Sequence, residues 1–403
     1  MISLLDAIFA IDNEIKNHTV KTKILTLQDA LNHISATSIK CTIALPPFDN
    51  SAMDGYAVCG NAQEFEVISK IFAGDTKNYT LKNKKAYRIF TGAKVPLNCD
   101  YVIPQEMVEL NEDRIILSNP LKANANIRKK GEDINIGDTI LDLGDRINSA
   151  HIALLASQGI DKVEVFCKPK VAVFSSGNEL KMAGDKIKSG EIYNSNIPYI
   201  LARSKEMNTD TYYLGECKDD KKYIKGLIKK GLDADLMVTS GGLSVGEADF
   251  IKEAFLELGL EIIFSKIAIK PGKPTTFGKI GNTYILNLPG NPLATALNFE
   301  IIGKYIINKI SNSNSTYLNT ISAILSEEIS SPKPVSSIIP GNFDGKKFYP
   351  LKGMMPGNVN VLNRANSIIV INESKDLIKK GGFVKIIPIS WNFFTKEFVD
   401  FTS

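Results

Sequence analysis

Three short glycine-containing turns are the segments of this sequence best suited to bind an anion. They are 175–179 (SSGNE), 240–244 (SGGLS) and 288–292 (LPGNP), and each follows an apolar run with the length of a buried strand. Glycine lets backbone N–H groups approach an oxyanion closely, and a helix that begins after the turn favours negative charge. One such turn is often only a tight connection, but three on consecutive strands indicate an extended anionic ligand. None matches the motifs of P-loop or dinucleotide-binding proteins.

Acidic residues follow two of these turns. Glu179 stands in the first turn, and Glu247 and Asp249 come shortly after the second. Carboxylates beside a phosphate would repel it unless a divalent cation joins them, and Mg²⁺ typically binds through carboxylates plus phosphate oxygens. The alternative is that these are first-turn helix residues, which the helix dipole favours. The sequence fits both interpretations.

Two lysines, Lys270 and Lys273, stand on the turn 270–274 (KPGKP). The prolines limit the backbone, so the two ammonium groups are partly fixed in place and suit a phosphate or another oxyanion. A solvated basic turn is the alternative. We favour binding because this turn comes just before the third strand, close to the glycine turns.

A second group of polar segments lies in the first third of the chain. Segment 48–58 (FDNSAMDGYAV) combines acids and turn residues with Phe48, Met53 and Tyr56, which a surface loop would not need. The segment 91–93 (TGA) ends a predicted strand, and 128–133 (RKKGED) mixes cations and acids before a turn. Each of these could also be a purely structural turn.

The composition excludes several classes of protein. Of 403 residues, 44% are hydrophobic and 23% charged, which favours sizeable cores over disorder. A formal net charge of +4 is small for a nucleic-acid binder. The three histidines lie in no motif and the five cysteines form no CxxC pair, which argues against structural zinc and disulfides and favours a reducing compartment. With no apolar run of about 18 residues and no basic leader, we expect a cytoplasmic protein without a membrane partner.

Periodicity divides the chain into four regions. Residues 1 to about 40 have helical spacing, with an apolar stripe at positions 2, 5, 8, 11 and 15 expected in the core and a second helix starting at Thr26. Short β patterns fill 46–146, and a helix is predicted near Ser149–Ser157. Strands then alternate with helices up to about 310, which predicts βαβ units. Further β patterns follow a polar stretch after Ser311.

The expected fold is therefore multi-domain, α/β plus β. It would contain a discontinuous helical linker domain (1–45 and 137–167), a β module (46–136), an α/β domain with a mainly parallel sheet (168–312) and a C-terminal β domain (318–396).

Seven segments of the chain occur together, in the same order, in one known family. They are PPFDNSAMDGYAV, RIFTGAKVP, IRKKGEDI, VFSSGNEL, SGGLSVGEADF, IKPGKPTTFGK and LPGNP. From about residue 2 to 390 the chain resembles the molybdopterin molybdenumtransferase (MoeA) family, whose eukaryotic relative is the gephyrin E domain. The resemblance implies a transferase of molybdenum cofactor biosynthesis with a molybdopterin-binding type of α/β domain. Its reaction would insert molybdate into adenylylated molybdopterin in a Mg²⁺-dependent step, releasing AMP and molybdenum cofactor.

The resemblance assigns roles to individual residues. The catalytic residues would be Asp54, Thr91, Asp133, Lys270 and Lys273. Together with the charge argument above, it makes Glu179, Glu247 and Asp249 the candidate Mg²⁺ ligands. The pterin–nucleotide substrate would be bound by Ser176, Gly177, Glu179, Ser240, Gly241, Gly242, Ser244, Gly246, Pro274, Pro289, Gly290, Asn291 and Pro292.

The resemblance also implies partners. It predicts a homodimer in which the β module of one subunit approaches the α/β domain of the other, so that both chains build the site. Contact with other molybdenum cofactor biosynthesis proteins is expected. Two other classes are open: a non-catalytic scaffold, and an adenylyltransferase that acts one step earlier. The adenylyltransferase would share the SGG turn but would be a single α/β domain.

The chain departs from the family pattern at three places. Ala294 stands where the family often has serine, 356–361 reads PGNVNV where a Gly-Ser stretch with paired serines is common, and 339–344 contains no arginine. These positions fall in the part of the family associated with the metal oxyanion. A preference for tungstate, or a weakly active paralogue, is the alternative that they suggest.

Overall fold

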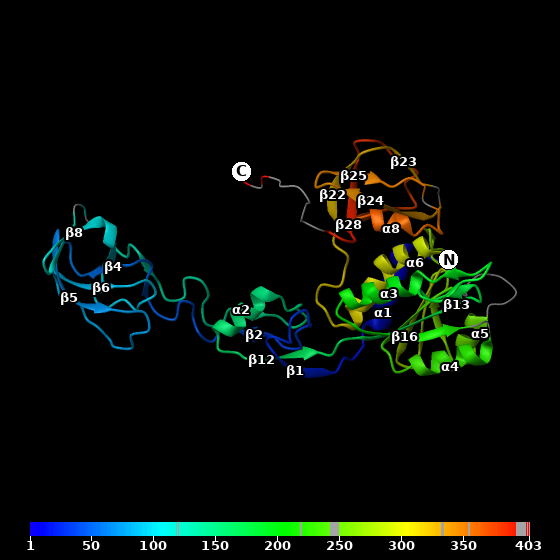
Figure 1. Ribbon diagram of the computed structural model, residues 1–403, viewed down its shortest axis with the longest axis horizontal. Coiled ribbons are helices and arrows are strands. Elements are labelled where there is room, and N and C mark those ends of the chain that lie inside the picture. Colours follow the sequence, from blue (N-terminus) through cyan, green and yellow to red (C-terminus); the bar gives the residue numbers. More distant parts are fainter. Residues whose placement is uncertain are drawn as a thin grey trace.

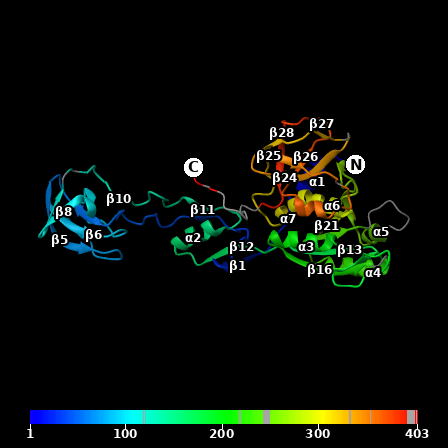
Figure 2. The ribbon, with the colours of Figure 1, turned by 45° about the horizontal axis from the view of Figure 1, so that its top comes forward.

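The structure is a computed structural model of the chain. It describes residues 1–117, 119, 121–217, 220–241, 250–331, 334–353, 355–391, 400 and 402. The molecule is elongated, with a β module at one end and the α/β and C-terminal β domains at the other (Figure 1). A slender linker domain lies between them, and the rotated view in Figure 2 shows the same separation. The predicted multi-domain α/β plus β fold is thus confirmed.

The β module is built on a six-stranded sheet in the order β7-β4-β6-β5-β9-β8. Its β5–β6 pair is parallel and its other neighbouring pairs are antiparallel. Along β4, Tyr56 and Val58 pack into one hydrophobic cluster and Ala57 into another, because successive side chains point to opposite faces. The elements are β4 (Gly55–Val58), β5 (Glu64–Ile71), β6 (Lys85–Ile89), β7 (Tyr101–Pro104), η1 (Gln105–Met107), β8 (Val108–Asn111) and β9 (Arg114–Leu117), with the outlying pair β3 (Asn50–Ser51) and β10 (Ile127–Arg128).

The linker domain joins two antiparallel strand pairs and one helix around a small core. The pairs are β1 (Thr22–Thr26) with β12 (Lys162–Phe166), and β2 (Ile39–Lys40) with β11 (Thr139–Leu141). Helix α2 (Ser149–Ser157) begins where the Asn148 side chain accepts a 2.9 Å hydrogen bond from the His151 N–H. Its residue Leu155 packs against Leu141 and Val165 from the strands.

The helix predicted to start at Thr26 is wrong, because Thr26 ends strand β1 and a single turn follows. The capping interaction between these residues does form: the Thr26 hydroxyl donates to the Asp29 carboxylate at 2.7 Å, and the Asp29 N–H donates back to that hydroxyl at 3.3 Å. However, β1 is paired along its length with β12, and Leu27 and Ala30 are buried in the linker core. These tertiary contacts outweigh local helix propensity.

The α/β domain has a six-stranded sheet in the order β16-β13-β17-β21-β20-β18. The first four strands are parallel to one another, and β20 and β18 are added to them by antiparallel pairings. This confirms the predicted mainly parallel sheet. The inner strands β13, β17 and β21 are buried along almost their whole length because helices cover both faces. The strands of the domain are β13 (Lys170–Ser176), β16 (Asp210–Cys217), β17 (Leu236–Ser240), β18 (Glu261–Phe264), β20 (Thr276–Ile280) and β21 (Thr283–Leu288), with the small parallel pair β14 (Leu180–Lys181) and β15 (Ile192–Tyr193).

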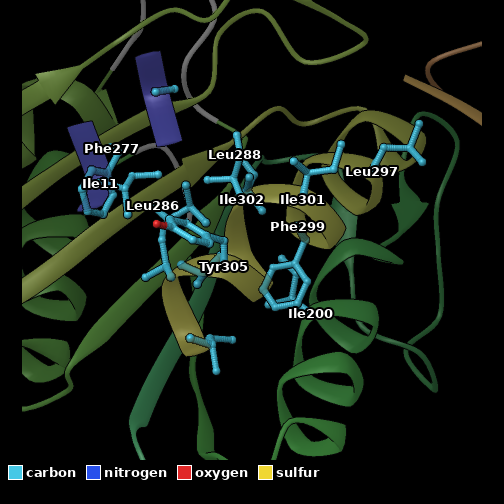
Figure 3. Packing of buried hydrophobic residues seen from close by; sticks show 14 of the residues in the cluster. Ile11, Ile200, Phe277, Leu286, Leu288, Leu297, Phe299, Ile301, Ile302 and Tyr305 are labelled. Atoms are coloured by element: carbon cyan, nitrogen blue, oxygen red, sulfur yellow. The ribbon is translucent and has the colours of Figure 1, made fainter. Parts of the chain in front are cut away.

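Two hydrophobic clusters lie on opposite faces of this sheet. One face is covered by α4 (Lys221–Gly231) and α5 (Phe250–Glu257), whose Ile224 and Phe255 pack against Phe174. The other face is covered by α3 (Asn196–Glu206) and by the continuous helical segment α6 (Pro292–Asn298), η2 (Phe299–Gly303) and α7 (Lys304–Ile310). Figure 3 shows Phe299 and Tyr305 of this segment beside the sheet.

Helix α1 (Leu4–Ile15) belongs by its contacts to the α/β domain rather than to the linker. Its Leu4, Ala7, Ile11 and Ile15 are buried in the large cluster beneath the sheet, and Ile11 stands beside Phe277 and Leu286 in Figure 3. The predicted stripe was correct at positions 11 and 15 but wrong at Leu5, which is 60% exposed. The buried face runs through Leu4 and Ala7 because these residues, not Leu5, share a face with Ile11.

The C-terminal domain is a closed β structure, since β26, the last strand of its sheet β19-β24-β25-β22-β28-β26, also pairs with β24. Strand β19 (Ile269–Lys270) comes from the α/β domain, so that part of that domain is paired into the C-terminal sheet. The other elements are β22 (Ile321–Leu325), β23 (Ile329–Ser330), β24 (Ser336–Phe343), β25 (Lys347–Pro350), α8 (Asn360–Arg364), β26 (Ser367–Ile371), β27 (Leu377–Ile378) and β28 (Phe383–Pro388). No helix in the described part of the chain is long and apolar enough to span a membrane.

Candidate active site

The three glycine turns begin at the same level of the parallel sheet. Ser175 of β13 is in register with Ser240 of β17, which is in register with Leu288 of β21. The carboxyl ends of neighbouring parallel strands are where open α/β sheets bind ligands. The turns therefore meet at one edge, although the first and the third are more than a hundred residues apart in the sequence.

A cavity of about 870 Å³ opens at this edge. It is lined by residues of all three turns and of the KPGKP segment, and also by residues that the sequence did not indicate. The predicted residues in its lining are Ser176, Gly177, Glu179, Ser240, Gly241, Lys273, Pro274, Pro289, Gly290, Asn291 and Pro292. The others are Leu180, Ile192, Tyr193, Asn194, Ser195, Asn196, Lys266 and Gly357.

Glycine is required at two positions in the cavity wall. Gly241 has φ +92°, and a Cβ there would lie 3.0 Å from the carbonyl oxygen of Ser176, so the first two turns approach through their backbones. Gly177 has φ +147°, and a Cβ there would lie 2.8 Å from a carboxylate oxygen of Glu179. The Glu179 carboxylate is thus folded back over the first turn, at the cavity wall.

Two asparagines that the sequence analysis missed hold the turns together. The Asn196 side-chain amide donates to the Ser240 hydroxyl and to the Gly290 carbonyl, each at 2.7 Å, and so joins the second and third turns. The Asn194 amide donates to the Ser175 hydroxyl at 2.7 Å and anchors the first turn. Asn194 lies just before α3 and Asn196 is its first residue, where no glycine pattern marked them.

The two lysines of the KPGKP turn have different positions. Lys273 lines the cavity, together with Pro274 and the unpredicted Lys266. Lys270 ends strand β19, is exposed and is not among the residues of the cavity wall. The structure therefore provides two cations, Lys266 and Lys273, at the cavity, but not the predicted pair.

The C-terminal domain contributes one wall. Gly357 lines the cavity, and the Leu293 N–H at the start of α6 donates to the Pro356 carbonyl at 3.0 Å. The segment 356–361, which departs from the family pattern, therefore stands directly beside the third turn. Ala294, the other departure, is buried in α6.

Several predicted residues lie outside the part that the structure describes. They are Gly242, Ser244, Gly246, Glu247 and Asp249. Of the three acids predicted to hold Mg²⁺, only Glu179 is described. Within the described residues, no group of three or more histidine, cysteine, aspartate or glutamate side chains could hold a metal ion by itself. A single carboxylate at the cavity fits a magnesium ion only if phosphate oxygens of a substrate complete the coordination.

The remaining predicted catalytic residues gather in the β module. The Thr91 backbone N–H and hydroxyl each donate to Oδ1 of Asp54 at 2.8 Å. Strand β3 connects this pair to the third polar segment, because Ser51 bonds to the backbone of Gly92 and pairs with Ile127. Segments far apart in the sequence thus form one polar cluster.

Asp133 lies further along the same segment, where the chain pairs with the residues that precede the β module. The Asp133 N–H donates to the Leu45 carbonyl at 3.0 Å, and its side chain is exposed. Asp49, which lies in the predicted segment 48–58 but was assigned no role, accepts from the Lys130 N–H at 2.8 Å and from the Lys129 ammonium at 2.9 Å. Burial would raise the pKa of Asp49, but these two hydrogen bonds outweigh it and lower the pKa.

The chain does not bring its two polar clusters together. Asp54, Thr91 and Asp133 belong to the β module, and the cavity belongs to the α/β domain at the opposite end of the molecule (Figure 1). A single chain therefore presents two halves of the predicted site.

Comparisons with known proteins agree with this architecture. A family model described as "MoeA N-terminal region (domain I and II)" matches residues 2–159, and one described as "Probable molybdopterin binding domain" matches 172–309. The molybdopterin molybdenumtransferase of Haemophilus influenzae is 42% identical over 296 residues, covering 72% of this chain and 73% of that protein. The protein of the same name from Staphylococcus epidermidis is 33% identical over 97% of both chains. The crystal structure of the molybdopterin biosynthesis MoeA protein from Pyrococcus horikoshii OT3 superposes with a TM-score of 0.86 at 25% identity, covering 96% of this chain and 100% of that chain.

The fold and the cavity define a multi-domain protein of molybdenum cofactor biosynthesis with a molybdopterin-binding α/β domain. More specifically, the chain belongs to the molybdopterin molybdenumtransferase (MoeA) family, as the predicted resemblance indicated.

Proposed function

We propose that this chain inserts molybdate into adenylylated molybdopterin and releases AMP and molybdenum cofactor. One observation carries the proposal: three backbone turns and two lysines converge on a single cavity of about 870 Å³. This volume is within the range of sites that bind a whole cofactor-sized molecule. The relatives that match along most of the chain are named for this transfer.

The residues of the cavity provide for two anions. Backbone N–H groups of the three glycine turns suit the phosphates of the adenylylated substrate, while Lys266 and Lys273 suit molybdate as point charges. Neutralising both anions is necessary because molybdate and a phosphoanhydride repel each other. Fixed cations and dipoles that face the developing charge also stabilise the transition state.

Magnesium has a place in this proposal. Glu179 would hold the ion at the first turn, and Glu247 and Asp249 are proposed as its other carboxylate ligands. When bound, Mg²⁺ would stabilise negative charge on the departing AMP. The role of Glu179 itself is to keep a carboxylate beside the phosphate-binding backbone, where it stands in the structure.

The site is proposed to be completed in a homodimer. Asp54, Thr91 and Asp133 are ordered by hydrogen bonds but lie far from the cavity of their own chain (Figure 1). If the β module of one subunit lies against the α/β domain of another, these residues meet Lys273 and the glycine turns. A closed two-fold dimer would contain two such composite sites. We further propose that the product passes to another protein of the same biosynthesis in the cytoplasm.

The proposal can be tested with the purified chain, adenylylated molybdopterin, Mg²⁺ and molybdate. AMP release that depends on molybdate is the expected result. Binding of the substrate without AMP release would favour a scaffold role. Formation of adenylylated molybdopterin from ATP and molybdopterin would instead favour the earlier adenylyltransferase step. Replacing molybdate by tungstate in the same assay measures the oxyanion preference.

A further inference from the structure

The KPGKP turn rests on a buried side chain, Asn298, the last residue of α6. Asn298 is fully buried. Its amide nitrogen donates to the Pro271 carbonyl at 3.1 Å and to the Ala294 carbonyl at 2.7 Å, and its amide oxygen accepts from the Thr275 hydroxyl at 3.2 Å. One polar side chain therefore bonds to the turn on both sides of Gly272.

Gly272 lets the turn lie directly on that amide. It has φ +118°, and a Cβ at this position would be only 1.9 Å from the Asn298 amide nitrogen. The Gly272 carbonyl in turn accepts from the Thr275 hydroxyl at 2.8 Å and from the Thr275 N–H at 3.0 Å. The turn is thus fixed by a small network in which Asn298 is the only contribution from α6.

The other end of α6 carries the third glycine turn. The helix begins at Pro292, and the Thr295 N–H donates to the Asn291 carbonyl at 2.9 Å. From Pro292 to Asn298 an α-helix rises by about 9 Å. Because a helix is stiff along its axis, this one element sets the spacing between the third turn and the lysine turn.

We propose that Asn298 is a positioning residue that fixes where Lys273 stands in the cavity, and so determines how tightly the site holds its oxyanion substrate. The proposal rests on the function proposed above. Asn298 does not line the cavity, and it acts only through the turn that carries Lys273 and Pro274. The third turn has its own supports in Asn196 and Thr295, so its binding of the nucleotide part should not depend on Asn298.

The first experiment measures AMP release against molybdate concentration for the full-length protein. In Asn298→Ala we expect the half-saturating molybdate concentration to rise about tenfold. This is roughly the effect of losing one hydrogen bond from a displaced Lys273 to the oxyanion. We expect the saturating rate and the Mg²⁺ dependence to stay within about twofold, since bonds to other parts of the site are kept. Thr275→Val removes only the hydroxyl and should shift the molybdate dependence in the same direction, which tests the link even if Asn298→Ala does not fold.

The matched control is Thr283→Ala. Thr283 is also buried, and its hydroxyl bonds to the backbone carbonyls of Leu232 and Ala234, each at 2.9 Å, at the start of β21, away from the cavity. It should lower the melting temperature without changing the molybdate dependence. The proposal is overturned if Asn298→Ala and Thr275→Val leave the molybdate dependence unchanged, or if Thr283→Ala changes it equally.

A second measurement is independent of activity. Hydrogen exchange of the peptide 266–277 should be faster in Asn298→Ala than in the wild type, while that of 283–290 should be unchanged. Equal exchange of 266–277 in both proteins would overturn the positioning role. If the wild type releases no AMP with molybdate, the proposed function fails, and the exchange experiment still decides whether Asn298 holds the turn.

Discussion

Asp54 and Thr91 form a two-bond contact at one carboxylate oxygen, with the Thr91 N–H and hydroxyl each 2.8 Å from Oδ1 of Asp54. These two bonds, together with the charge of Arg88, lower the pKa of Asp54 although the residue is partly exposed. The second carboxylate oxygen receives no hydrogen bond from the described residues. An aspartate held in one orientation, ionised and open to solvent is suited to act on a group that arrives from outside its own module.

Removing the Thr91 hydroxyl should change the pH dependence of the reaction. A lowered pKa keeps Asp54 ionised further into acid, so activity that needs the carboxylate is lost only as the pH falls through that lowered value. Thr91→Val removes one of the two bonds and should raise the pKa of Asp54 toward its ordinary value. The acidic limb of the pH–rate profile for AMP release should therefore move to higher pH.

The control for this experiment lies in the same module. The Tyr79 hydroxyl donates to Asp75 at 2.6 Å and is the main cause of the lowered pKa of Asp75. Tyr79→Phe should leave the pH profile unchanged because Asp75 is not a predicted site residue. Asp54→Asn should be inactive at every pH with an unchanged melting temperature. An unmoved profile in Thr91→Val would remove Asp54 from the ionised groups that the reaction needs.

A composite site predicts that two inactive variants can restore each other. Asp54→Asn inactivates the β-module half of the site, and Lys273→Ala disables the cavity half when molybdate is kept well below the concentration that this variant needs. In a heterodimer of the two, one of the two sites combines both intact halves. After random subunit exchange, about a quarter of all sites should be intact, so AMP release should recover to about a quarter of the wild-type rate.

Mixing Asp54→Asn with Asp133→Asn is the matched control, because both changes lie in the β module and no heterodimer site is then intact. Recovery in the first mixture alone supports a site built from two chains. Absence of recovery in a verified heterodimer would mean that the residues of one chain suffice for the reaction. The β module would then have to fold back onto the α/β domain of its own chain, unlike the elongated arrangement in Figure 1.

A buried ion pair should contribute to the stability of the α/β domain. Glu300, in η2, is 1% exposed and accepts hydrogen bonds from Arg203 at 2.7 and 2.8 Å and from Tyr199 at 2.7 Å. Burial alone would raise the pKa of Glu300, but the bond from Arg203 and the charges of Lys304 and Arg203 outweigh it and lower the pKa. A lowered pKa means that this stabilisation is present above the ordinary glutamate pKa and is lost as the pH falls through the lowered value.

Arg203→Met should cost about 3–5 kcal/mol at neutral pH, because it leaves a buried carboxylate without its main partner. The loss should shrink on acidification, when Glu300 can take up a proton, and the double variant Arg203→Met with Glu300→Gln should be more stable than the single one. Urea unfolding at several pH values measures this. The exposed pair Arg114–Glu64 is the comparison, and Arg114→Met should cost much less because solvent screens an exposed pair. A loss in Arg203→Met that does not depend on pH would contradict this account.

What the sequence could predict of the site depended on how local the signal was. Gly177, Gly241 and Gly290 were found because a glycine after an apolar run is a short-range pattern, and their meeting followed from the rule for parallel strands. Asn194, Asn196 and Lys266 carry no such pattern, since an asparagine or lysine in a loop is ordinary. Gly357 comes from another domain, and only the family resemblance connected its segment, 356–361, with the site. A contact distant in the sequence also explains the error at Thr26, where pairing with a strand more than a hundred residues away decided the local structure.

The two lysines of the KPGKP turn should differ in function, although the sequence gives them equal weight. Lys273 lines the cavity, whereas Lys270, at the end of strand β19, is exposed and absent from the cavity wall. Lys273→Ala should raise the half-saturating molybdate concentration about 10–100-fold, as expected for the loss of a charged hydrogen-bond donor. Lys270→Ala is the matched control and should have a much smaller effect. Equal effects would mean that Lys270 reaches the site in the working assembly.

Glu179 should affect how the reaction depends on Mg²⁺ rather than on molybdate. Its carboxylate lies over Gly177 at the first turn, and Glu179→Gln keeps the shape of the side chain while removing its charge. If this carboxylate holds Mg²⁺ beside the phosphates, the half-saturating Mg²⁺ concentration should rise about tenfold or more, while the molybdate dependence stays near that of the wild type. Titrating AMP release against each ion in Lys273→Ala and Glu179→Gln separates the two roles. If both variants respond alike to both ions, the cavity does not divide its charges between molybdate and magnesium, even if the overall reaction is the one proposed.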